Sequence, residues 1–74
     1  MSEDELANTR QPGERYFTWI KRCAKDEEAR RTLALVIQRG IEILALDVDK
    51  NWSEICRSAK AYGILQKAWR KSKR

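Results

Sequence analysis

Histidine is absent from this sequence of 74 residues, and proline occurs only once, cysteine twice and glycine three times. Histidine is the side chain whose ordinary pKa lies nearest neutrality, and it is the commonest metal ligand. Without it, acid–base catalysis needs carboxylates or lysines with strongly shifted pKa values, and therefore a deep pocket. A few short helices rarely provide one, so we expect a protein that is not an enzyme and that uses no cofactor or metal.

The two cysteines, Cys23 and Cys56, are too far apart in the sequence to form a C-x-x-C motif. They therefore indicate neither a zinc knuckle nor a redox site. The amino end is acidic, and the longest apolar run is interrupted by Glu42, so no secretory signal peptide is evident. We expect an intracellular protein with free thiols, in the cytoplasm, nucleus or nucleoid, that is not secreted.

Asp47, Asp49 and Asn51 match the opening of a calcium-binding EF-hand loop. The match ends there, because the sixth loop position holds Trp52 where glycine is needed, and the twelfth holds Ser58 where a bidentate glutamate is needed. We interpret the segment as a polar turn between two helices and predict no metal site in it.

Apolar residues recur at helical spacing along most of the chain, without the alternation of a β-strand. The pattern predicts an all-α fold, in which residues 13–74 form a small three-helix domain around a long central apolar helix. Residues 1–12 are predicted to form a mobile acidic N-terminal arm, with Ser2 and Glu5 as a cap for one helical turn. The expected helices cover residues 14–25, 27–46 and 52–71, and a basic tail follows them.

The helix boundaries depend on two capping residues. Asp26 is a favourable first cap, because Glu27 and Glu28 then place negative charge at the start of the second helix. A single bent helix from Glu14 onward remains an alternative, since no glycine or proline forces a break. Asn51 and Glu54 have the spacing of a capping box for the third helix.

The small size of the domain favours pairing with a second copy. At this length only about 60% of the unfolded chain's surface can be buried, so a homodimer would add useful burial. Leu35 and Leu46 lie outside the main apolar stripe of the central helix. We interpret them as half of a subunit contact, although single exposed leucines are also ordinary.

Positive charge is concentrated in two segments of the chain. Residues 15–25 carry a net charge of +4 and residues 50–74 a net charge of +7. The whole chain carries only +5, because the remaining segments are net acidic. Such clustering indicates a polyanionic partner, although a merely solvated surface is an alternative. The cations expected on the outer faces of the first and third helices are Arg15, Lys21, Arg22, Lys25, Arg57, Lys60, Lys67, Arg70, Lys71 and Arg74.

We therefore expect a non-enzymatic protein that binds nucleic acid through backbone phosphates with little sequence preference. Arg39-Gly40-Ile41 is a poor helix-turn-helix turn, because apolar helical spacing continues through it. The alternative is an adaptor or inhibitor of the viral or phage accessory type, with Leu35, Leu46 and Trp52 as anchors on a larger protein. Membrane attachment is the least favoured, since the stripe of the third helix, which includes Trp69, is expected in the core.

Overall fold

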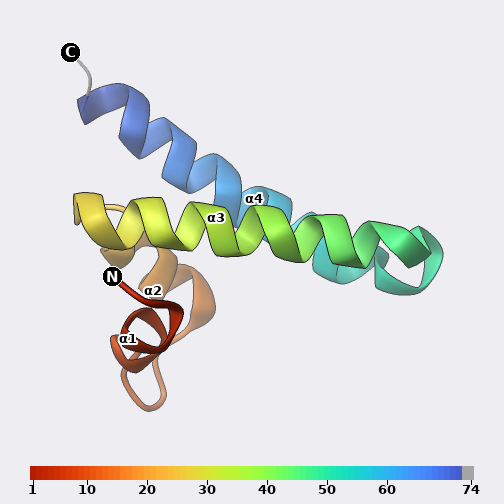
Figure 1. Ribbon diagram of the computed structural model, residues 1–74, viewed down its shortest axis with the longest axis horizontal. Coiled ribbons are helices and arrows are strands. Elements are labelled where there is room, and N and C mark those ends of the chain that lie inside the picture. The colour runs from red at the N-terminus through yellow and green to blue at the C-terminus, as the bar shows by residue number, and fades with distance from the viewer. Residues whose placement is uncertain (73–74) are drawn as a thin grey trace.

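A computed structural model describes residues 1–72, and this part of the chain is helical with no β-strand (Figure 1). The all-α prediction is confirmed. The two longest helices, α3 and α4, form an antiparallel hairpin, and α1 and α2 lie against the end of the hairpin that is opposite its turn (Figure 1). The elements are α1 (Glu3–Asn8), α2 (Tyr16–Cys23), α3 (Glu27–Leu44), the 3-10 helix η1 (Ala45–Asp47) and α4 (Val48–Ser72).

The break between α2 and α3 lies where Asp26 predicts it. The Asp26 side chain accepts a hydrogen bond from the backbone nitrogen of Ala29 at 3.2 Å, and Glu27 and Glu28 occupy the first turn of α3. Both features stabilise the positive end of the helix dipole. The alternative of one bent helix is therefore wrong.

The turn between α3 and α4 is tighter than expected. We expected a polar connection followed by a helix from Trp52, but α4 begins at Val48. The Asp47 side chain accepts a hydrogen bond from the backbone nitrogen of Lys50 at 3.3 Å, while Asn51 Nδ2 donates one to the carbonyl oxygen of Leu44 at 3.1 Å. Asn51 thus lies inside α4, where it satisfies a carbonyl at the end of α3 instead of capping a new helix.

Residues 1–12, expected to be a mobile arm, are folded against the domain. Their helix α1 packs on α3, and Leu6 is only 3% exposed. The predicted cap is confirmed, since the Ser2 hydroxyl accepts a hydrogen bond from the Glu5 nitrogen at 3.2 Å. Two ion pairs also join this segment to α3: the terminal ammonium of Met1 to Glu28 at 2.6 Å, and Arg39 to Glu3 at 3.0 Å.

The core lies where α1 and α2 meet the open end of the hairpin. Ile20 and Leu65 are its largest fully buried side chains. Ala61 of α4 is completely buried, and α4 packs against both α2 and α3. A side chain as small as alanine lets neighbouring helices approach closely. Trp69 was expected in the core but is 42% exposed. The side of α4 that packs into the core is therefore the side of Ala61 and not that of Trp69.

Candidate nucleic-acid interface

A shallow groove of about 290 Å³ runs between α2 and the second half of α4. Ala24, Ile64 and Ala68 line it with apolar side chains. The other residues that line it are four lysines: one from α2, one from the turn that follows α2, and two from α4. We call this set the lysine face: Lys21, Lys25, Lys67 and Lys71.

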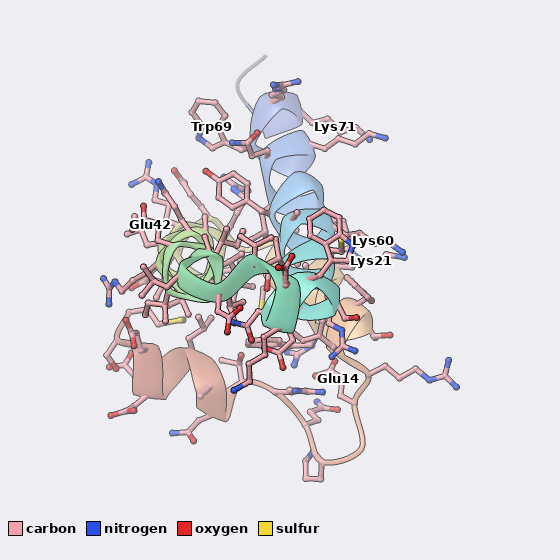
Figure 2. The ribbon with its side chains drawn as sticks, turned by 90° about the vertical axis from the view of Figure 1, so that its right-hand side faces the viewer. Glu14, Lys21, Glu42, Lys60, Trp69 and Lys71 are labelled. Carbon is pink, nitrogen blue, oxygen red and sulfur yellow. The ribbon has the colours of Figure 1, made fainter. Side chains whose placement is uncertain are left out.

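The lysine face carries charge of one sign. No carboxylate lines the groove, and within residues 1–72 none of its four lysines forms an ion pair with an aspartate or glutamate. All four side chains are exposed. Figure 2 shows Lys21 and Lys71 on the same side of the molecule, although they come from helices far apart in the sequence. The fold thus gathers positive charge that the sequence alone could only assign to separate helices.

Two further cations extend this surface along α4. Arg57 and Lys60 are separated from Lys67 and Lys71 by intervals that place all four side chains on one side of a helix. At a rise of 1.5 Å per residue, this stripe is about 21 Å long. Lys60 Nζ lies 4.8 Å from the centroid of the Phe17 ring, so a cation–π contact joins the stripe to α2.

Arg22 has a different role from the one that its charge predicts. Its Nε and Nη2 donate hydrogen bonds to the two carboxylate oxygens of Glu14 at 3.0 and 2.8 Å, and its Nη2 also donates to the carbonyl oxygen of Thr9. These hydrogen bonds from Arg22 lower the pKa of the Glu14 carboxyl, whose side chain is only 10% exposed. Arg22 therefore secures the loop before α2, and its charge is balanced there.

Two further predicted cations, Arg15 and Arg70, do not line the groove. Arg15 is exposed at the N-cap of α2, and Arg70 is exposed on α4, about 100° around the helix from Lys71. Arg74 lies outside the described residues. Our sequence reasoning missed the apolar side chains of the groove, although Ile64 and Ala68 share the helix face of Lys67 and Lys71 and gave a usable signal.

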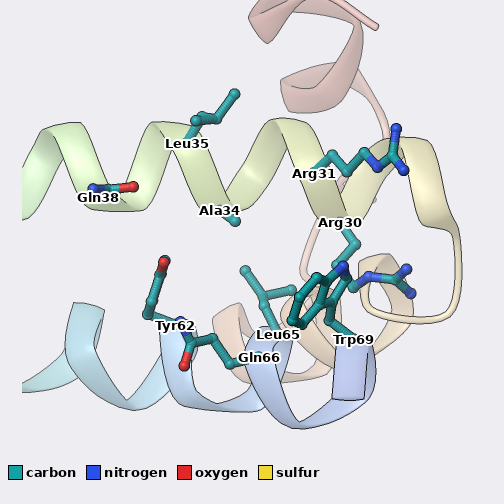
Figure 3. A pocket seen from close by; sticks show the side chains of 9 residues that line it. All are labelled: Arg30, Arg31, Ala34, Leu35, Gln38, Tyr62, Leu65, Gln66 and Trp69. Atoms are coloured by element: carbon teal, nitrogen blue, oxygen red, sulfur yellow. The ribbon is translucent and has the colours of Figure 1, made fainter. Parts of the chain in front are cut away.

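The residues predicted as a protein interface are exposed and come from three different elements. Leu46 and Trp52, which are 87% and 60% exposed, lie near the hairpin turn. Leu35, 62% exposed, borders a second groove of about 400 Å³ between α3 and α4 (Figure 3). Tyr62 and Trp69 line that groove, while the Leu35 side chain points away from α4 (Figure 3).

Other kinds of site have little support in the described part of the chain. Residues 1–72 contain no group of three or more cysteine, aspartate or glutamate side chains arranged to hold a metal ion. Both thiols are free; Cys23 is buried and Cys56 exposed, and desolvation raises the pKa of Cys23. None of the helices described combines the length and the apolar character that crossing a bilayer requires.

Comparison with protein-family models, with curated proteins and with solved structures found no match to this chain.

Proposed function

We propose that this protein binds the phosphate backbone of duplex nucleic acid through the lysine face, with little sequence preference and without catalysing a reaction. The observation that carries the proposal is the convergence of four exposed lysines, from α2, the turn after it and α4, on a groove without a carboxylate. Lysine ammonium groups neutralise phosphates and release the counterions condensed on the duplex, which is the main source of non-specific affinity.

The chemistry of the groove favours contact with the backbone over contact with bases. Recognition of base edges uses arginine, lysine, asparagine and glutamine side chains. Of these only lysine lines the groove, and its ammonium group binds phosphates as a point charge. Stacking on unpaired bases uses exposed aromatic rings. No aromatic side chain lines the groove either, and the nearby Phe17 ring is half-buried with Lys60 above it. A regular duplex, which presents phosphates at its surface, fits this arrangement best.

The proposal includes the pairing of two copies. A pair would present two lysine faces and double the charge available to a polyanion. The large apolar side chains left exposed near the hairpin turn, of which Leu46 is the most exposed at 87%, support such pairing, because a second copy would remove them from water.

The test compares two double variants with the same net charge. Lys25→Gln with Lys67→Gln removes half of the lysine face, and Arg31→Gln with Lys50→Gln removes two exposed cations elsewhere. Binding to two unrelated duplexes is measured by fluorescence anisotropy in about 50 mM salt. We expect the first variant to bind at least about 10-fold more weakly and the second to bind as the wild type does.

Equal weakening of both variants would mean that affinity follows net charge and not the lysine face. No binding by the wild-type protein at this salt concentration would remove the proposal altogether. Circular dichroism of each variant checks that its helices are retained. We expect them to be retained because the four substituted side chains are all exposed.

A further inference from the structure

The side of α3 that faces away from α4 is only partly covered: Met1 contacts Glu28 and Thr32 near its start, and Glu3 pairs with Arg39. Leu35 on this side is 62% exposed, and Leu46, just beyond the end of α3 in η1, is 87% exposed. Arg39 and Glu42 lie between them and are also exposed. Intervals of four and three residues place Leu35, Arg39 and Glu42 on one stripe of α3, and Leu46 follows four residues later in the 3-10 turn. We call this set the α3 outer face: Leu35, Arg39, Glu42 and Leu46.

The α3 outer face is self-complementary about its midpoint. Counting outward from the point between residues 40 and 41, Arg39 corresponds to Glu42 and Leu35 corresponds to Leu46. In a two-fold symmetric pair of antiparallel helices, residue i of one copy faces residue j of the other, and j faces i. Antiparallel pairing about this midpoint therefore sets leucine against leucine, and arginine against glutamate, twice over.

We infer that two copies of this chain pair antiparallel through the α3 outer face. Leu35 of each copy packs on Leu46 of the other, and Arg39 of each copy forms an ion pair with Glu42 of the other. The inference deepens the pairing included in the proposed function, but it does not depend on nucleic-acid binding. The mixture of both charge signs distinguishes this face from the lysine face and suits a second copy better than a polyanion.

The present partner of Arg39 does not prevent this contact. Arg39 forms an ion pair with Glu3 of its own chain at 3.0 Å, but the two side chains are 66% and 60% exposed. Exposed ion pairs of this kind contribute little to stability, so the guanidinium can bind a second carboxylate or exchange partners.

Pairing through this face leaves the lysine face open. Glu42 projects from the side of the molecule opposite to Lys21, Lys60 and Lys71 (Figure 2). The lysine faces of a pair would therefore point away from each other. If the proposed function holds, one dimer binds two separate duplex segments, one on each lysine face.

The test exchanges the charges of the interface and needs no nucleic acid. Arg39→Glu and Glu42→Arg each set like charges against each other twice, so each variant alone should have the mass of one 8.7 kDa chain by light scattering. An equimolar mixture of the two variants restores both ion pairs and should have twice that mass, as should the wild-type protein. Glu3→Gln, which removes only the intrachain partner of Arg39, should leave the wild-type mass unchanged.

A disulfide experiment checks the register directly. Chains carrying Leu35→Cys are mixed with chains carrying Leu46→Cys, both with Cys56→Ser to remove the exposed native thiol. The two new thiols should join one chain of each kind, and the mixed disulfide should form much faster than either disulfide between identical chains.

If light scattering gives the wild-type protein the mass of one chain at about 100 μM, the inference is overturned. Pairing weaker than this would leave the protein unpaired at ordinary concentrations. A dimer that survives both charge exchanges would also overturn it, because another face must then hold the copies together. Either result leaves the duplex-binding measurement untouched, so failure of the pairing and failure of the proposed function are separable.

Discussion

The two ends of the α3–α4 hairpin differ in how they use apolar residues. At the open end, α1 and α2 cover the hairpin, and all of the buried residues lie there. At the turn end, no residue from Gln38 to Lys60 is buried. Four large apolar side chains of this end are largely exposed: Ile43, Leu46, Val48 and Trp52.

This difference separates the part that stabilises the fold from the part that is free to bind. The lysine face lies at the open end, where Ala24 of its groove is itself a core residue. Lys21, Lys67 and Lys71 therefore project from helices that pack on the core, and Lys25 directly follows the buried Ala24. The turn end contributes few interactions to folding, so its apolar side chains can be changed at little cost.

The largest expected effect compares the same substitution at both ends. Ile20→Ala removes a fully buried side chain, and we expect it to lower the free energy of unfolding by about 2–5 kcal/mol. Ile43→Ala changes a side chain that is 62% exposed, and we expect a change within about 0.5 kcal/mol. Urea unfolding followed by circular dichroism measures both values. Similar losses for the two variants would show that the turn end is also part of the core.

A smaller difference is expected between the two aspartates that cap helices. Asp26→Ala removes the cap of α3 beside the core and should lower the free energy of unfolding by about 1 kcal/mol. Asp47→Ala removes an exposed hydrogen bond at the turn end and should cost less than half as much. The same urea experiment decides the order, and a larger loss at Asp47 would contradict the comparison.

A pH-dependent effect is expected at the open end. Because Arg22 lowers the pKa of Glu14 in the folded protein, the ionised carboxylate stabilises the fold above the ordinary pKa of a glutamate, and this contribution is lost as the pH falls through the lowered pKa. Glu14→Gln should therefore lose less stability than the wild type between about pH 5 and pH 3.

Glu54→Gln, which changes an exposed glutamate at the turn end that has no ion pair among the described residues, is the control for this pH dependence. Thermal unfolding at a series of pH values should give a curve for this variant that is parallel to the wild type. If the Glu14→Gln curve is also parallel to the wild type, the hydrogen bonds with Arg22 do not lower the pKa of Glu14 on folding.

The helical type of the segments and two helix starts could be predicted from the sequence because their causes are local. Asp26 caps α3 through an atom three residues away, and Ser2 caps α1 in the same way. At the hairpin turn, however, the sequence predicts Asn51 as the cap of the third helix, whereas the structure uses Asp47, four residues earlier. The earlier residue is used, because a tight 3-10 turn lets Asn51 bind back to the end of α3.

The arrangement of the helices could not be predicted, because it depends on long-range packing. Periodicity placed Trp69 in the core, but the fit of α4 between two neighbours buries the small Ala61 instead. For the same reason, the sequence identified the lysines of two helices as binding residues but not the groove that joins Lys21 and Lys25 to Lys67 and Lys71.

The salt dependence of duplex binding tests the account most directly. The logarithm of the association constant is measured against the logarithm of the salt concentration, from about 50 to about 200 mM, for the wild type and for a variant with all four lysines of the lysine face changed to glutamine. Each phosphate contact contributes about 0.9 to the slope, so the slope should become shallower by about 3 to 4. An unchanged slope in the variant would contradict the assignment of the lysine face as the phosphate-binding surface.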